Sequence, residues 1–325
     1  MKIYPIFIPF GGCETRCIYC QQELITRTEK VDIDTLIPKI EEFIVNNPNF
    51  DREIAFYGGS FTLLPITEQK RLINKIARFI PYIKGIRIST RPDGINQETL
   101  ELCRSFSINT IELGIQSFSD HVLKATKRPY TSQQAVESCQ LIRNKGFKLG
   151  IQLMPGLPGD TFCNWSQTVE TTINCTPDYI RIYPTLVLKG TELEEQYLMG
   201  VYIPLSLSKA IVITSKAYSI FENARLKVIK MGLHSDVSYK DDQVIAGPYH
   251  PAFAELVYQH ILYRKIVDST TFHNNLCVSN KDESLLYGHG RSLLKKLERK
   301  LGNRMPNISF DENMERFTVK ANQEF

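Results

Sequence analysis

The sequence predicts an α/β protein built on a parallel β-sheet. Apolar, strand-like runs and segments with helical spacing alternate about six times up to residue 190. Strict alternation of this kind is typical of parallel strands joined by right-handed helical crossovers. A polar or glycine-rich motif follows almost every expected strand, and the carboxyl ends of parallel strands are where such sheets collect their binding sites. The pattern fits either an open doubly wound sheet or a full or partial barrel.

The expected strands are short apolar runs that end just before these motifs. They comprise residues 3–10, 54–57, 86–90, 110–115, 147–154 and 179–184. The helices between them show apolar residues at a spacing of 3.6 and comprise residues 32–46, 67–80, 97–105, 132–145 and 165–174. Beyond residue 190 the alternation weakens, and we expect helices over 205–224, 251–265 and 285–301, a strand at 227–231, and strands on both sides of the last helix.

The composition is that of an ordinary globular protein, with 42% hydrophobic and 23% charged residues and a formal net charge of +4. The N-terminal apolar run is too short for a signal peptide, and no stretch approaches the roughly 18 apolar residues of a membrane helix. We therefore expect a cytoplasmic protein without a membrane segment. Free cysteine is commonly a small core residue, and we expect this structural role for the scattered Cys103, Cys139, Cys163, Cys175 and Cys277.

The most specific motif is the group Cys13, Cys17 and Cys20, which directly follows the first strand. Thiolates this close together bind a metal ion or a cluster. A structural zinc site needs four ligands, and no fourth one is near, since the next candidates are Cys103 and His121. Three thiolates suit a 4Fe-4S cluster in which one iron stays open to bind a cofactor or substrate.

With Tyr19 just before the last cysteine, this loop resembles that of the radical S-adenosylmethionine (SAM) superfamily. The resemblance implies a partial (β/α)6 TIM-type barrel with a small C-terminal α/β extension, and a 4Fe-4S cluster and SAM as cofactors. It also implies that an electron from the cluster cleaves SAM, and that the resulting 5′-deoxyadenosyl radical abstracts hydrogen from a substrate. The protein positions the cofactors and excludes water and oxygen. An electron donor such as flavodoxin or ferredoxin is implied as a partner.

Motifs at the later strand ends resemble SAM-binding motifs of the same superfamily. Gly58, Gly59 and Ser60 resemble its Gly-Gly-Glu motif, with Ser60 in place of the acid. Two glycines let a ligand approach the backbone closely, although a plain turn is the alternative. Ser89 stands where related enzymes often carry a Glu that contacts SAM, and its hydroxyl can still hydrogen-bond the ribose.

The motifs at two further strand ends resemble SAM-binding motifs of oxygen-independent coproporphyrinogen oxidase. Gln116 and Arg128 are twelve residues apart, like the SAM-binding Gln and Arg of that enzyme, and an Arg matches a carboxylate through its planar fork. Gln152 stands where that relative has a ribose-binding Asp. The alternative for Arg128 is a solvated position in the basic run of residues 124–128.

Three residues are candidates for the catalytic centre. Glu112 lies inside an apolar strand, where a buried carboxylate is costly unless it is paired. The run from Arg181 to Thr191 resembles the Elongator catalytic subunit, which implies that Tyr183 and Lys189 face the reacting centre. Packing of Tyr183 in the core is the alternative. We expect no acetyltransferase domain of the Elongator type, so the acetyl-CoA chemistry of that family on tRNA uridine is not carried over.

The last part of the chain is basic, with six basic residues and one acid between Arg291 and Arg304. A glycine-rich turn at residues 288–290 before this helix loosely resembles half of a KH RNA-binding domain, while a solvated face is the alternative. His250 is either a proton donor or a packed residue. We divide the chain into a radical SAM core barrel (1–235), a barrel-closing extension (236–268) and a small basic α/β region (269–325).

The leading interpretation is therefore a radical SAM enzyme that modifies RNA, such as a tRNA-like substrate. A second possibility is the oxidation or rearrangement of a small molecule such as a porphyrinogen, whose anionic groups would meet Arg91, Arg181 or Lys189. A third is a non-enzymatic iron–sulfur protein that binds RNA or acts as a sensor. The sequence carries neither a second cysteine cluster nor a cobalamin-binding signature.

Overall fold

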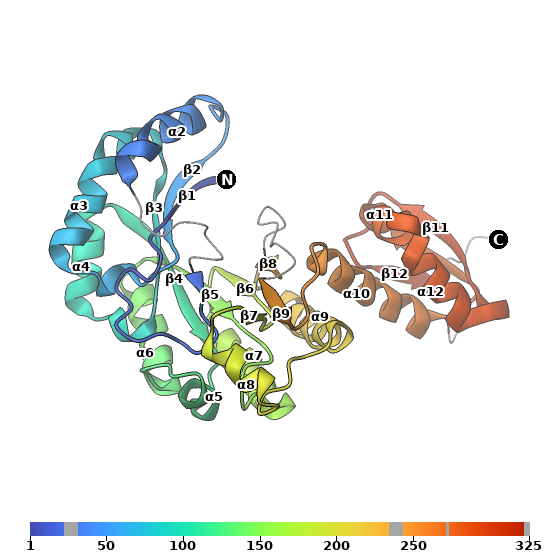
Figure 1. The fold of residues 1–325 in the computed structure, drawn as a ribbon. Coiled ribbons are helices and arrows are strands. Elements are labelled where there is room, and N and C mark those ends of the chain that lie inside the picture. The colour runs from blue at the N-terminus through green and yellow to red at the C-terminus, as the bar shows by residue number, and fades with distance from the viewer. Residues whose placement is uncertain (23–31, 234–242, 271–272, 322–325) are drawn as a thin grey trace.

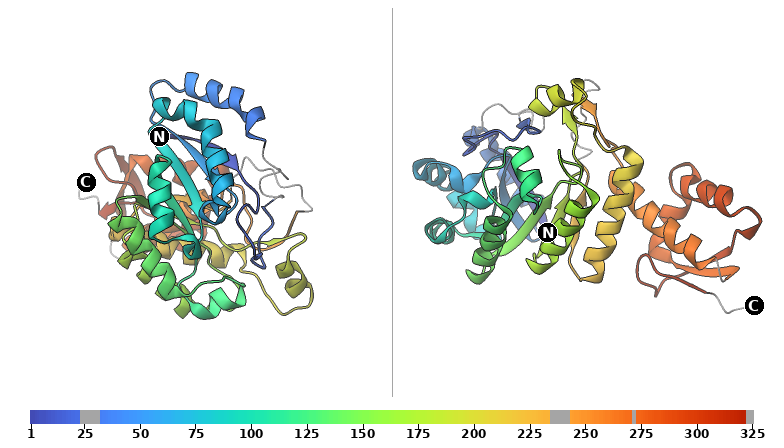
Figure 2. Two further views of the ribbon diagram at one scale, coloured as in Figure 1. Left: turned by 90° about the vertical axis from the view of Figure 1, so that its left-hand side faces the viewer. Right: turned by 90° about the horizontal axis from the view of Figure 1, so that it is seen from below.

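The computed structural model describes residues 1–22, 32–233, 243–270 and 273–321. Its largest element is a seven-stranded, entirely parallel sheet with the strand order β1-β2-β3-β4-β5-β6-β8. The strands curl into a half-barrel, as the two further views show (Figures 1 and 2). The strands are β1 (Lys2–Phe7), β2 (Arg52–Tyr57), β3 (Gly85–Thr90), β4 (Ile108–Gln116), β5 (Lys148–Leu153), β6 (Tyr179–Ile182) and β8 (Val228–Met231). The predicted partial TIM-type barrel is confirmed.

Helices cover the convex face of this sheet (Figure 2). The crossover helices are α2 (Ile33–Val45), α3 (Ile66–Ile76), α4 (Gln97–Ser105), α6 (Ser132–Asn144), α7 (Phe162–Asn174) and α9 (Leu207–Asn223), all within a few residues of their predicted ranges. Capping boxes at Asn96 and Thr131 begin α4 and α6 by accepting the backbone N–H three residues on. Two short helices, α5 (Asp120–Ala125) and α8 (Glu192–Leu198), were not predicted, because so few residues show no measurable helical period.

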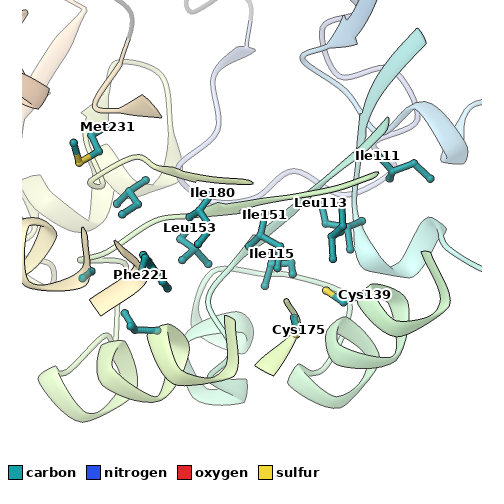
Figure 3. Packing of buried hydrophobic residues seen from close by; sticks show 14 of the residues in the cluster. Ile111, Leu113, Ile115, Cys139, Ile151, Leu153, Cys175, Ile180, Phe221 and Met231 are labelled. Carbon is teal, nitrogen blue, oxygen red and sulfur yellow. The ribbon is translucent and has the colours of Figure 1, made fainter. Parts of the chain in front are cut away.

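The core lies between the sheet and these helices. Isoleucine and leucine side chains of β4, β5 and β6 point toward α6, α7 and α9, where Phe221 packs against them (Figure 3). Cys103, Cys139 and Cys175 are buried there, as expected of structural cysteines. Cys163 differs, because it is exposed at the start of α7.

After β6 the chain leaves the regular alternation. A two-stranded antiparallel pair, β7 (Val187–Leu188) and β9 (Val244–Ala246), lies beside the end of the barrel. The long helix α10 (Phe253–Ser269) then packs against α9 and leads to the C-terminal unit. No helix of the described residues is long and apolar enough to cross a membrane.

The C-terminal unit has its own three-stranded sheet and stands beside the barrel (Figure 1). Its strands are β10 (Asn275–Ser279), β11 (Asn307–Asp311) and β12 (Val319–Ala321), in the order β11-β10-β12. The predicted continuous helix over 285–301 is wrong. It is divided into α11 (Glu283–Tyr287) and α12 (Ser292–Leu301), because Gly290 and Arg291 take left-handed backbone angles. One continuous hydrophobic core nevertheless extends from the barrel through α9 and α10 into this unit.

Candidate active site

A cavity of about 690 Å³ opens at the carboxyl ends of the barrel strands. The ends of β1 to β6 all contribute side chains or backbone to its wall. Every residue predicted for the site lines it except Lys189. The predicted residues in the lining are Cys13, Cys17, Tyr19, Cys20, Gly58, Gly59, Ser60, Ser89, Glu112, Gln116, Arg128, Gln152 and Tyr183.

The cysteine loop is held against the end of β2 by backbone contacts. The N–H of Ser60 donates to the carbonyl oxygen of Gly11 at 2.7 Å. A Cβ on Gly59 would lie 2.4 Å from that oxygen, and a Cβ on Gly12, which has a φ of +73°, would lie 2.3 Å from the Ser60 oxygen. Gly59 is therefore required for loop packing, a role that the sequence did not indicate. From the other side, the N–H of Leu193 in α8 donates to the carbonyl of Ile18 at 2.8 Å.

The three thiols of this loop are free and face one cavity. Cys17 is buried, whereas Cys13 and Cys20 are half-buried, and Cys13 Sγ lies 3.7 Å from Ser60 Oγ. The pKa of Cys20 is raised to about 12, first by burial and then by the nearby thiols of Cys17 and Cys13. Ionisation of all three thiols in this loop would therefore require a cationic group beside them.

The donor set fits an iron–sulfur cluster better than a single zinc ion. Among the described residues, no three His, Cys, Asp or Glu side chains are close enough together to hold one metal ion. A mononuclear zinc site needs such a closed set. Three soft thiolates on one cavity wall are the ligands that an iron–sulfur cluster uses.

Arg128 lies in the wall of this cavity and not on a solvated face. Its Nη1 donates to Cys17 Sγ at 3.1 Å and to the Tyr19 hydroxyl at 3.4 Å. Its Nε donates to the hydroxyl of Tyr130 at 2.7 Å, and its Nη2 donates to the Gly114 carbonyl. The guanidinium is thus oriented by the protein and brings a fixed positive charge next to the cysteine loop.

The two predicted glutamines meet on neighbouring strands. Gln152 Nε2 donates to Gln116 Oε1 at 3.3 Å. Gln116 has a φ of +69°, and the register between β4 and β5 shifts between Gly114 and Gln116. A bulge of this kind re-aims a side chain at the end of a strand, and here it directs Gln116 into the cavity.

Glu112 is the centre of a buried network in the floor of the cavity. Its Oε1 accepts hydrogen bonds from Tyr57 at 2.9 Å, Arg87 at 2.8 Å, Tyr179 at 3.0 Å and Arg181 at 3.1 Å. The carboxylate is therefore paired, as its burial in an apolar strand requires. Two arginines and two tyrosines around a single oxygen make this side chain a rigid part of the cavity.

The network continues behind the cavity to a second carboxylate. Arg87 donates to Glu53 Oε2 from Nε at 2.9 Å and from Nη2 at 2.6 Å, and both side chains are almost fully buried. Two carboxylates, Glu53 and Glu112, thus balance two guanidinium groups, Arg87 and Arg181. The sequence analysis missed Glu53 and Arg87, although charged residues inside apolar strands are the same signal that singled out Glu112.

Tyr183 extends this network into the cavity. Its hydroxyl accepts a hydrogen bond from Arg181 Nη1 at 3.2 Å, and burial raises its pKa. Its own proton is therefore retained at neutral pH and can be donated toward a ligand. The Arg181 Nε is buried without a partner among the described residues.

Three other residues considered from the sequence lie differently. Lys189 is exposed and outside the cavity wall, beside β9, where its backbone N–H donates to Gln243. His250 Nδ1 accepts the backbone N–H of Ala252 at 3.0 Å outside the cavity, as a packed histidine does. Arg91 lines the cavity, where Asp93 pairs with it at 2.7 Å.

Comparison with known proteins agrees with this architecture. A model of the radical SAM superfamily matches residues 7–172, and a model of the radical SAM C-terminal domain matches residues 177–262. A tRNA uridine(34) acetyltransferase of Methanocaldococcus infernus is 29% identical over 198 residues, which are 60% of this chain and 36% of that protein. The heme chaperone HemW of Bacillus subtilis is 26% identical over 195 residues, 58% of this chain and 51% of that one.

A solved structure extends the comparison to the fold. Archaeal Elp3 from Methanocaldococcus infernus superposes with a TM-score of 0.61 at 22% identity, covering 81% of this chain and 63% of that one. The chain thus spans about a third to a half of the length of the two sequence relatives. The family's cofactors are a 4Fe-4S cluster and SAM, and this chain has three free thiols in the lining of one cavity. With its family model matched from β1 to α7 over the strands that carry this cavity, the chain belongs to the radical SAM superfamily of enzymes.

Proposed function

We propose that the protein binds a 4Fe-4S cluster on Cys13, Cys17 and Cys20 and uses SAM to modify an RNA, with a tRNA-like molecule as substrate. The observation that carries the proposal is the convergence of three free thiols and the SAM-motif residues on one cavity. When bound, the cluster supplies the electron that cleaves SAM to a 5′-deoxyadenosyl radical. A donor such as flavodoxin or ferredoxin would supply that electron.

The side chains around the thiols would hold SAM. Arg128 presents a charged fork beside Cys17, which suits the carboxylate of SAM. The backbone at Gly58 and Gly59 and the hydroxyl of Ser60 border the thiols, which suits the amino group. Gln116 and Gln152, already hydrogen-bonded to each other, offer amide groups to the ribose together with Ser89 and Tyr19, which line the same cavity.

Deeper in the cavity, Tyr183 is the group best placed to act on a substrate. Arg181 donates to its hydroxyl and so polarises the O–H bond, which favours donation to a substrate carbonyl oxygen. Glu112 acts as the positioning residue for Arg181. Lys189 is exposed and lies outside the cavity wall, so we assign it a contact with the part of a large substrate that remains outside the cavity.

RNA as the substrate class is supported by two observations. One relative carries the name tRNA uridine(34) acetyltransferase. The segment from Arg291 to Arg304 is also strongly basic and exposed, as a phosphate-binding surface requires.

A small anionic substrate such as a porphyrinogen is the second candidate. Arg91 and Arg181 both line the cavity, and the only carboxylate in its lining, among the described residues, is Glu112. Propionate groups would pair with these guanidinium groups. A measurement of turnover with a porphyrinogen and RNA present in competition would decide between the two substrate classes.

The direct test is anaerobic reconstitution with iron and sulfide, followed by SAM and a strong reductant. We expect 5′-deoxyadenosine from the wild type and none from Cys17→Ala, with Cys277→Ala as the matched control that retains activity. The iron content of Cys17→Ala should fall in parallel. A Cys17→Ala protein that keeps its iron and still forms 5′-deoxyadenosine would overturn the assignment of the cluster site.

A further inference from the structure

The outer face of α10 and α12 concentrates positive charge next to an aromatic ring. Along α12, Leu293, Leu297 and Leu301 are buried, so the helix periodicity places Lys296 and Lys300 together on one flank. Glu298 falls on the opposite flank. The flank with the two lysines is the one that adjoins α10.

Contacts between the two helices show this directly. Ser292 Oγ lies 3.4 Å from Gln259 Oε1, and one turn further along, Lys296 Nζ lies 4.3 Å from the centre of the Tyr263 ring. His260 lies beside Tyr263, with ring centres 6.3 Å apart. Residues of both helices therefore form a single surface, which we call the basic face: His260, Tyr263, Arg264, Lys296 and Lys300.

Like charges crowd this surface. The pKa of His260 is lowered, first by burial and then by the charges of Lys296 and Arg264. Arg264 pairs with the carboxylate of Asp268 at 3.8 Å, with both side chains more than half exposed. Such a pair contributes little in water. The basic face therefore keeps an excess of positive charge that an anionic partner would neutralise.

We propose that the basic face binds the sugar–phosphate backbone of an RNA, and this proposal rests on the proposed function. Closely spaced lysines and an arginine match successive phosphates, and release of their counterions drives binding. Tyr263 and His260 add ring surfaces of the kind on which unstacked RNA bases stack. The basic face lies in a unit that stands beside the barrel (Figure 1), so only an extended ligand can contact it and the cavity together.

The test measures binding of an unmodified tRNA transcript to the full-length protein by fluorescence anisotropy at several salt concentrations. In the double variant Lys296→Gln, Lys300→Gln we expect affinity about tenfold weaker near 0.1 M salt, and a slope of log K against log salt smaller by about 1 to 2. The matched control is Lys39→Gln, Lys70→Gln. It removes two exposed lysines from α2 and α3, at the opposite end of the molecule, and should bind like wild type (Figure 1).

The outcomes separate the two proposals. Wild-type protein that does not bind the tRNA would overturn both the basic face and RNA as the substrate class. Binding that is unchanged in the α12 variant, or reduced equally in the control, would overturn the basic face alone. A DNA duplex of equal length that binds as tightly, with the same sensitivity to the α12 variant, would assign the face to DNA. Formation of 5′-deoxyadenosine without RNA should be unchanged in both variants.

Discussion

Among single residues, Tyr130 is the one whose role the contacts define most sharply. Its buried hydroxyl accepts the Nε hydrogen of Arg128 at 2.7 Å and lies 3.0 Å from the Gly114 carbonyl oxygen and 2.9 Å from that of Ile115. It thus connects the bulge of β4 to the guanidinium that we assign to SAM. Tyr130 is a positioning residue, since it acts through Arg128.

We expect Tyr130→Phe to raise the dissociation constant for SAM about tenfold, because a hydrogen bond to a charged group contributes about 1.5 kcal/mol. Isothermal titration of the reconstituted protein measures this constant. Tyr287→Phe, at an exposed tyrosine, is the control and should leave it unchanged. An unaltered affinity in a folded Tyr130→Phe protein would show that SAM binding does not depend on the orientation of Arg128.

For single residues, the sequence predicted which side chains line the cavity better than it predicted their hydrogen-bond partners. The cysteines, Gln116, Arg128 and Gln152 were found because their spacing and strand ends resemble a family. Their contacts depend on strands that are far apart in the sequence, so Arg87 and Tyr179 could not be connected to Glu112 in advance. The φ of +69° at Gln116 was equally hidden, because a bulge is set by the neighbouring strand and not by the residue itself.

At the scale of elements, the buried charges join four strands of the sheet, three of them adjacent and the fourth, β6, separated from β4 by β5. Glu53 belongs to β2, Arg87 to β3, Glu112 to β4 and Arg181 to β6. These ion pairs cross the inside of the half-barrel. They give the cavity a polar floor, which apolar side chains at the same positions would not provide.

Replacing Glu112 with Gln should therefore destabilise the fold by about 3 kcal/mol, because two buried guanidinium groups lose a counter-charge. The free energy of unfolding in urea measures the effect. Glu42→Gln, which changes an exposed carboxylate on α2, should alter it by less than about 0.5 kcal/mol. A similar free energy for both variants would mean that the network is not a structural requirement.

The turn between β5 and α7 contains a carboxyl group, Asp160, that makes the free energy of unfolding depend on pH. Burial raises the pKa of Asp160 to about 6, partly opposed by the Gly156 N–H that it accepts at 2.9 Å. Its other oxygen, Oδ1, is buried without a partner among the described residues. The folded state therefore holds the proton of the Asp160 carboxyl more tightly than the unfolded state does. The stability that this protonation contributes is lost as the pH rises through about 6.

Asp160→Asn should remove this loss of stability, because an amide does not ionise, and its oxygen can still accept the N–H of Gly156. We expect the stability advantage of the variant over wild type to grow by about 1 kcal/mol between about pH 5 and pH 8. Urea unfolding of both proteins at the two pH values gives the difference. An advantage that shrinks with rising pH would contradict the raised pKa.

The order of elements was predicted with few errors, and the errors have physical causes. Strands ending in glycine or polar residues, and helices with an apolar stripe, are encoded locally. The pair β7 and β9 was missed because residues more than fifty positions apart form it. The helix over 285–301 was predicted too long because its apolar spacing continues across Gly290, where the backbone turns left-handed.

At the scale of the whole molecule, the continuous core joins the barrel to the C-terminal unit. Trp165, the single tryptophan, lies in α7 of the barrel and reports on the barrel alone. We expect its fluorescence and the far-ultraviolet circular dichroism to show the same urea midpoint, as in one cooperative transition. A dichroism change that precedes the fluorescence change would show that the C-terminal unit unfolds separately.

The anchoring of the cysteine loop has a consequence for the lifetime of the enzyme. Hydrogen bonds from Ser60 and from Leu193 hold the loop on both sides through protein contacts alone. Neither hydrogen bond involves a thiol, so we expect both to persist when the cluster is lost. After exposure to air has destroyed the cluster, the same polypeptide is expected to be repaired by reinsertion of iron and sulfide, without new synthesis of the chain.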